Sequence, residues 1–146
     1  MKRSKFTEEQ IAFALHQAAN ALKPGGLLFV ATPAFQRFWS YNDDLANHLR
    51  RYTRGDFKAI AEQTALKLVD SRYFMFFLSP LYLLSRLKPG FDKLPQEQKR
   101  KIVEDQHRVP AAPLNAALAA AFAAESPIGH WLPFPWGTSI LGVFKK

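Results

Sequence analysis

The chain has 146 residues, of which 48% are hydrophobic and 14% aromatic, so it can form a buried core and wholesale disorder is excluded. It contains no cysteine, which excludes disulfides, thiolate zinc sites and thiol catalysis and is typical of a cytoplasmic protein. The net charge of +8 comes from three separate basic clusters, which predicts a solvated basic surface and no specific recognition of nucleic acid.

The first predicted element is a helix from Thr7 to Leu22. Thr7 is placed to cap its N-terminus, and Gln10 completes a capping box. Apolar residues recur at helical spacing and predict one stripe that faces the core: Ile11, Ala14, Leu15, Ala18 and Leu22.

A helix stop and a strand follow directly in the segment LKPGGLLFVA, residues 22 to 31. Pro24 prevents the helix from continuing, and Gly25 or Gly26 can adopt the left-handed conformation that ends helices. The strand from Gly26 to Thr32 shows no polar alternation, which predicts that it is buried on both faces. This order of elements indicates an α/β fold.

An irregular segment rich in aromatic residues, 33 to 51, precedes the next helix. The adjacent Asp43 and Asp44 are expected in a solvated loop, since neighbouring carboxylates diverge in extended chain and form no catalytic pair. Thr53 and Asp56 then form a second capping box, which predicts a helix from Arg54 to about Thr64. Tyr52 is placed to pack against Phe57 as a hydrophobic staple.

The remaining pattern predicts two strands and three helices, in the order Leu66–Tyr73 (strand), Phe76–Leu87 (apolar helix), Gln96–Gln106 (charged helix), Leu114–Ala124 (apolar helix) and Gly137–Phe144 (strand). The two apolar helices could cover an active site or lie in a membrane interface. We favour a helical cap with its own small core. The apolar stretch from Tyr73 to Leu87 contains too many polar residues, and is too short, to span a bilayer.

Five segments together resemble the C-terminal half of a class I S-adenosylmethionine-dependent methyltransferase. They are LKPGG, an apolar strand ending in Thr32 and Pro33, WSYND, HLRRYTRGDF and the closing FPWGTSILGVFKK. The resemblance covers residues 20 to 146. It implies part of a Rossmann-like α/β sheet, with about three strands, a helical insertion at residues 76 to 130, and the last strand inserted antiparallel between the other two.

The resemblance implies S-adenosylmethionine as the family's cofactor and a small-molecule or lipid-like methyl acceptor. The family binds the cofactor through a glycine-rich turn after the first strand and an acidic residue that ends the second. Neither lies upstream of Leu22, and Gly25 and Gly26 precede their strand. We therefore expect no cofactor-binding residue, no metal site, and no methyltransferase activity from this chain alone.

Trp39, His48, Arg51 and Tyr52 are the candidate substrate-binding residues. Open α/β sheets place ligands in the loop between a strand's carboxyl end and the next helix, and in the resembled family this loop lies beside the substrate. His48 could act as a general base and Arg51 could pair with a carboxylate or phosphate. The alternative, which we favour, is that Arg51 and Tyr52 order the loop while Trp39 anchors it. No residue is assigned as catalytic.

Residues 1 to 18, MKRSKFTEEQIAFALHQA, resemble the start of the small DNA-binding subunit of insertion-sequence transposases. We therefore predict a fusion of a transposase-like helix, residues 1 to 19, with the methyltransferase-like part. The match ends before any recognition helix, so a transposase-derived DNA-binding protein is the alternative function. The truncated sheet would expose one edge of the strand at 26 to 32, which predicts self-association through it.

Overall fold

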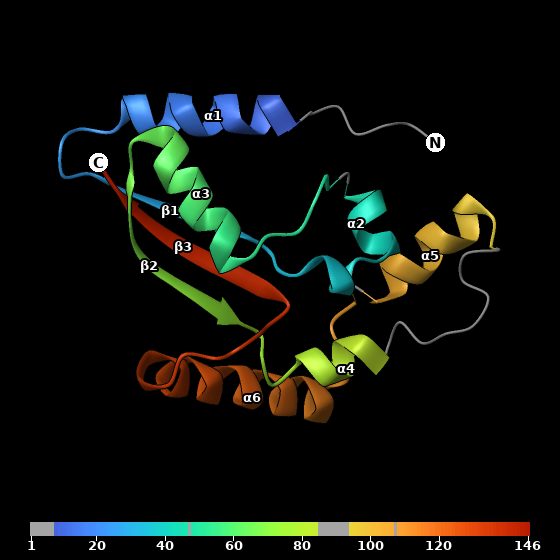
Figure 1. The fold of residues 1–146 in the computed structure, drawn as a ribbon. Coiled ribbons are helices and arrows are strands. Elements are labelled where there is room, and N and C mark those ends of the chain that lie inside the picture. Colours follow the sequence, from blue (N-terminus) through green and yellow to red (C-terminus); the bar gives the residue numbers. More distant parts are fainter. Residues whose placement is uncertain (1–7, 47, 85–93, 107) are drawn as a thin grey trace.

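A computed structural model describes residues 8–46, 48–84, 94–106 and 108–146, and they form a mixed α/β fold (Figure 1). The strands are β1 (Leu27–Pro33), β2 (Lys67–Phe74) and β3 (Ser139–Lys145). The helices are α1 (Glu8–Ala21), α2 (Tyr41–Leu45), α3 (Arg54–Thr64), α4 (Ser79–Leu84), α5 (Gln96–Gln106) and α6 (Ala112–Trp131), with a 3₁₀ turn, η1, at Gln36–Phe38. The predicted α/β class is confirmed.

The three strands lie in the order β1-β3-β2, and β3 is antiparallel to both of its neighbours. Gly142 of β3 is opposite Val30 of β1 on one side and Ser71 of β2 on the other. Because β3 opposes both, β1 and β2 point the same way and their carboxyl ends meet at one edge of the sheet. The prediction that the last strand inserts between the other two is confirmed.

One face of the sheet carries the core, and α1 and α3 cover it (Figure 1). Phe57 of α3 is fully buried against Phe144 of β3, with ring centroids 5.6 Å apart. A Cβ at Gly142 would lie 2.5 Å from the Phe57 ring, which is closer than real Cβ atoms approach. Glycine at this position is therefore what lets α3 pack so closely on β3.

The predicted first helix is present as α1, and Ala19 and Leu22 join the core. The proposed cap, Thr7, and the side chains of Ile11 and Ala14 lie outside the described part of the chain. Gly25 adopts φ +80° after the helix, in the left-handed region that glycine tolerates. Its amide donates to the Lys146 carbonyl at 2.9 Å, which ties this turn to the end of β3.

The prediction that β1 is buried on both faces is wrong. Leu27 is 49% and Phe29 63% exposed, whereas Leu28 and Val30 on the opposite face are half-buried. Leu28 and Val30 pack against the core cluster, while α6 contacts β2. An apolar run gives the same sequence signal whether one face or two are covered, so the pattern could not distinguish these cases.

The second capping box is confirmed, and α3 has the predicted bounds. The Thr53 amide donates to Asp56 Oδ2 at 2.7 Å, and the Asp56 amide donates to Thr53 Oγ1 at 3.3 Å. The Tyr52 and Phe57 rings pack with centroids 6.1 Å apart, as the staple requires. Local side-chain chemistry therefore sets the start of α3.

Helices α4 and α6 lie below the sheet in Figure 1 and form a cap. Helix α4 begins at Ser79, later than the predicted Phe76. Met75, the residue after β2, has a left-handed φ of 61°, so the chain turns there before the helix begins. Helix α6 extends beyond the predicted Ala124, through Pro127, to Trp131. None of the described helices is long and apolar enough to cross a bilayer.

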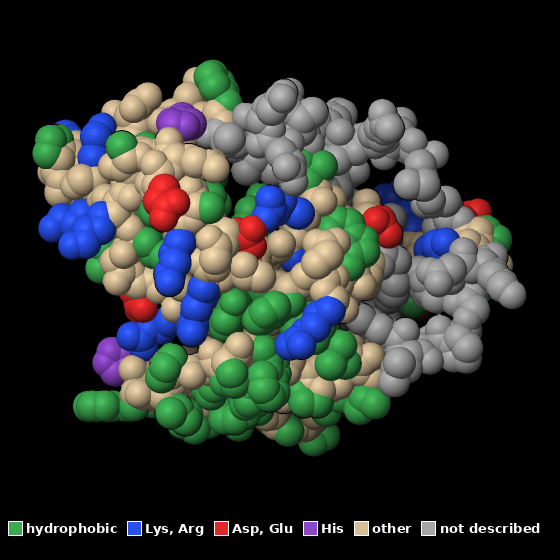
Figure 2. Space-filling view, viewed as in Figure 1, with side chains coloured by type: hydrophobic (Ala, Val, Ile, Leu, Met, Phe, Trp, Pro, Cys, Tyr) green, Lys and Arg blue, Asp and Glu red, His purple; other side chains and the backbone are tan. Residues whose placement is uncertain are grey.

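The cap has a small aromatic core and an apolar outer surface. Phe76 stacks on Phe134 with centroids 4.7 Å apart and packs against Trp136 at 4.8 Å. Figure 2 shows apolar side chains gathered over α4 and α6, and several of them are exposed: Leu81, Leu83, Leu84, Phe122, Ile128 and Trp131. The three aromatic residues of the small core flank α4 and α6, whereas the only described residues buried within the two helices are Ser79 and Glu125.

Candidate functional site

A cavity of about 460 Å³ lies at the carboxyl ends of β1 and β2. Its wall includes Pro33, the last residue of β1, and Met75, the residue after β2. Helix α2 and the loop that follows it supply four of the polar residues, and the others are Tyr82, Thr138 and Ser139. Open α/β sheets place their ligands outside the carboxyl ends of the strands, so this cavity is the candidate site.

A buried ion pair between Asp43 and Arg51 forms the centre of the site. Their side chains are 1% and 3% exposed. Arg51 donates from Nε to Asp43 Oδ1 at 3.0 Å and from Nη2 to Oδ2 at 2.9 Å, so the pair is bidentate. Bidentate guanidinium–carboxylate pairs combine strong charge-assisted bonds with a fixed geometry.

The prediction that Asp43 lies in a solvated loop is wrong, and α2 is the reason. Ser40 caps this one-turn helix, and its amide donates to Asp43 Oδ2 at 2.8 Å in a capping box. The turn directs Asp43 toward Arg51 and leaves Asp44 exposed, where it accepts a bond from Trp39 Nε1 at 3.2 Å. Two adjacent aspartates therefore occupy opposite environments.

The remaining donors of Arg51 bind protein groups. Nη1 donates to the carbonyl of Ala34 at 3.2 Å and to that of Thr138 at 3.3 Å, and Nη2 donates to the Tyr82 hydroxyl at 2.8 Å. Arg51 thus links the segments that follow β1 and precede β3 to α4. With its donors engaged in this way, the guanidinium orders the loop and offers little to an anionic ligand.

His48 is the exposed member of this network. Its Nδ1 lies 3.0 Å from Asp43 Oδ1, and its side chain is 41% exposed. Burial raises the pKa of Asp43. Hydrogen bonds from Arg51, His48 and the Ser40 amide lower it by more than burial raises it, so the pKa lies below its ordinary value. Asp43 is therefore charged at neutral pH. In the His48 tautomer that donates an Nδ1–H hydrogen bond to Asp43, Nε2 is the acceptor that remains for a ligand.

Asn42 adds a second acceptor to the cavity. It lines the wall, and its Oδ1 atom is buried without a hydrogen-bond partner. Two acceptors, Asn42 Oδ1 and His48 Nε2, favour a ligand that donates O–H or N–H bonds. Asn42, Asp43 and Tyr82 did not appear among the sequence candidates, although SYND, residues 40 to 43, contains the capping-box spacing that positions Asp43.

Of the four sequence candidates, His48 and Arg51 line the cavity. Trp39 is half-buried and bonded to Asp44. Tyr52 packs against Phe57, and its backbone bridges to Pro33 and Phe35 on the strand side of the loop. These contacts of Trp39 and Tyr52 are those of loop anchors.

The glycine turn at Gly25 and Gly26 lies away from the cavity. The turn at Gly25 and Gly26 binds Lys146 at the opposite end of the sheet from the cavity. Within the same part of the chain, no group of three or more metal-binding side chains comes together. The cavity lining thus consists of other residues, among them the polar Asn42, Asp43, His48 and Arg51.

No protein-family model matches the chain, and comparison with curated proteins and with solved structures also gives no significant match.

Proposed function

We propose that the chain is the acceptor-binding, C-terminal part of a class I methyltransferase-like fold and that these 146 residues transfer no methyl group by themselves. The observation that carries this proposal is the antiparallel insertion of β3 between β1 and β2. That is the strand arrangement which the resemblance of residues 20 to 146 implies. The cavity at the carboxyl ends of β1 and β2 gives the acceptor a place to bind.

The proposed acceptor is a small molecule with a hydroxyl or amino group next to an apolar part. Its donor hydrogen bonds to His48 Nε2 or Asn42 Oδ1, while Pro33 and Met75 contact the apolar part. When a hydroxyl gives up its proton, His48 holds it and the charged Asp43 stabilises the resulting imidazolium. These residues thus supply binding and proton removal, and no step through the cofactor is assigned to them.

Phenol is a suitable probe for this acceptor site, followed by NMR. We expect saturable shifts centred on His48 and Asn42, and weaker binding to the His48→Gln variant. His16→Gln is the matched control, because His16 is exposed on α1, outside the cavity lining. Shifts spread evenly over the surface, or equal affinity of wild type and His48→Gln, would refute the acceptor site.

Calorimetric titration with S-adenosylmethionine tests the second half of the proposal. We expect no saturable binding at cofactor concentrations of about 1 mM, because the glycine turn and ribose carboxylate are not among these residues. A dissociation constant in the low micromolar range would show that the chain holds a cofactor site of its own.

The alternative function, a transposase-derived DNA-binding protein, is supported by the likeness of residues 1 to 18 and by the net charge of +8. Against it, Ala19 of α1 is buried in the core, and β1 follows where a recognition helix would be needed. We expect weak, sequence-independent DNA binding that fades with salt. Preference for one duplex over scrambled DNA by more than about tenfold would favour the alternative.

A further inference from the structure

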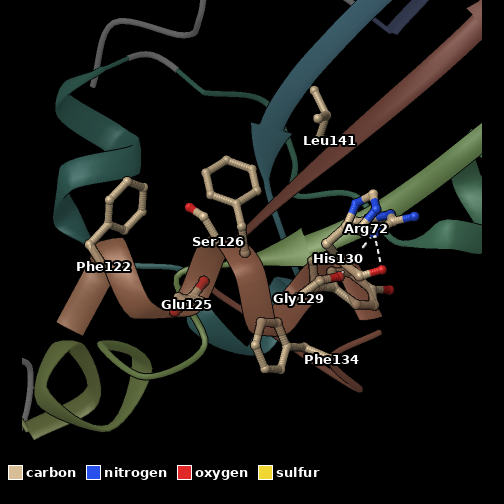
Figure 3. A pocket seen from close by; sticks show the side chains of 10 residues that line it. Arg72, Phe122, Glu125, Ser126, Gly129, His130, Phe134 and Leu141 are labelled. Carbon is tan, nitrogen blue, oxygen red and sulfur yellow. Dashed lines mark hydrogen bonds between the residues drawn. The ribbon is translucent and has the colours of Figure 1, made fainter. Parts of the chain in front are cut away.

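A second cavity, of about 330 Å³, lies between α6 and the strands β2 and β3 (Figure 3). It lies on the sheet face opposite the core, where Arg72 and Leu141 are paired neighbours on adjacent strands. Phe122 and Phe134 contribute aromatic walls. None of its lining residues lines the candidate acceptor site, so the two cavities are separate.

Glu125 of α6 is the unusual residue in this cavity. It is only 3% exposed, and its Oε2 accepts a bond from the Phe77 amide at 2.9 Å. Its other carboxylate oxygen, Oε1, is buried and has no hydrogen-bond partner. A buried carboxylate with an unsatisfied oxygen is costly, and proteins normally pair such groups with a cation or with further donors.

The arginine in the cavity is committed to other partners. Arg72 donates from Nε to Asp70 at 2.7 Å. Its Nη1 donates to the carbonyls of Gly129 and His130, at 3.0 and 2.9 Å (Figure 3). These bonds fasten the last turn of α6 to β2. Arg72 therefore shapes the cavity, and the structure records no ion pair between it and Glu125.

We propose that this cavity binds an organic ammonium ion with a compact apolar body. The charged nitrogen would donate to Glu125 Oε1, while the body packs against Phe122, Phe134 and Leu141. Aromatic faces attract cations, so the same walls suit both parts of such a ligand. A purely apolar ligand would leave Oε1 unpaired. A metal ion is not favoured, because no group of three or more metal-binding side chains comes together among the described residues.

The size of the cavity limits the ligand further. At about 330 Å³ it lies near the lower end of the range for small-molecule sites. That volume suits one aromatic ring with a short aminoalkyl arm. Phenethylammonium is therefore a suitable probe, and 2-phenylethanol is its neutral counterpart of nearly the same shape.

The test compares the two probes by calorimetry on the full chain. Wild type should bind phenethylammonium at least about tenfold more tightly than 2-phenylethanol. Glu125→Gln keeps an acceptor for the Phe77 amide but removes the charge, so the ammonium should lose that advantage while the alcohol binds as before. Glu104→Gln is the matched control, because Glu104 is exposed on α5, and it should behave as wild type.

Three results would overturn the proposal. They are equal affinity of wild type for the two probes, unchanged ammonium binding in Glu125→Gln, and no saturable ammonium binding to wild type at about 10 mM. If circular dichroism shows that Glu125→Gln is unfolded, Phe122→Ala replaces it as the test variant. Phe122 is 44% exposed, so removing its ring leaves the core intact. Phe122→Ala should weaken ammonium binding, and unchanged affinity would also refute the site.

Discussion

Replacing Asp43 with asparagine should destabilise the protein severely. The substitution keeps the size of the side chain but leaves the guanidinium of Arg51, itself 3% exposed, without its counter-ion. Removing one partner of a buried ion pair costs about 3–5 kcal/mol of the free energy of unfolding. Since small domains are stable by about 5–15 kcal/mol, this one change would remove a large part of the total.

Urea denaturation at pH 7, followed by far-ultraviolet circular dichroism, measures this loss. Asp44→Asn is the matched control, because Asp44 is the next residue, is exposed, and its carboxylate accepts a bond from the Trp39 ring nitrogen. It should cost less than about 1 kcal/mol. If Asp43→Asn costs no more than Asp44→Asn, the buried pair does not hold the loop as we describe.

The same pair predicts a pH dependence with a definite sign. The pKa of Asp43 is lowered in the folded state, so its contribution to stability is complete above the unfolded value of about 3.9. It is lost as the pH falls through the lower, folded value. The difference in unfolding free energy between wild type and Asp43→Asn should therefore narrow below about pH 4. A difference that stays constant down to about pH 3 would contradict the lowered pKa of Asp43.

Three further substitutions, and Gly55→Ala as a control for the first of them, test the fold. Gly142→Ala should cost about 1–3 kcal/mol, because its Cβ would meet the Phe57 ring, whereas Gly55→Ala in α3 meets only the nearby cap side chain, 3.5 Å away, and should be neutral or stabilising in thermal melts. Thr53→Ala should lower the unfolding free energy by about 0.5–2 kcal/mol through loss of the α3 cap. Phe29→Lys should reduce self-association in size-exclusion chromatography at a cost below about 1 kcal/mol, since the ring is 63% exposed.

Local signals in the sequence predicted the elements well. The capping box at Thr53, the stop at Pro24 and the charged helix Gln96–Gln106 depend on neighbouring residues only, and the structure contains all three. The position of β3 between its neighbours came from the family resemblance, because pairing partners leave no local trace in a single sequence.

The features that sequence reasoning missed depend on distant contacts. Asp43 is buried because it pairs with Arg51 and because the capping box of α2 directs its side chain inward. A pair of adjacent aspartates in the sequence indicates neither of these contacts. Phe29 is exposed because α6 of the cap packs against β2. Glu125 lies in a strongly helical, alanine-rich stretch, where only the tertiary structure shows that its carboxylate is buried.

Amide hydrogen exchange along β1 is the most direct test of whether this sheet is part of a larger one. Within the described residues β1 pairs only with β3. In a monomeric sample, verified by size-exclusion chromatography, every second amide of Leu27–Ala31 should therefore exchange quickly, while the amides of β3 are protected on both sides. Uniformly slow exchange along Leu27–Ala31 in the monomer would mean that another segment covers this edge, and it would contradict the proposal that the chain is one part of a divided methyltransferase-like sheet.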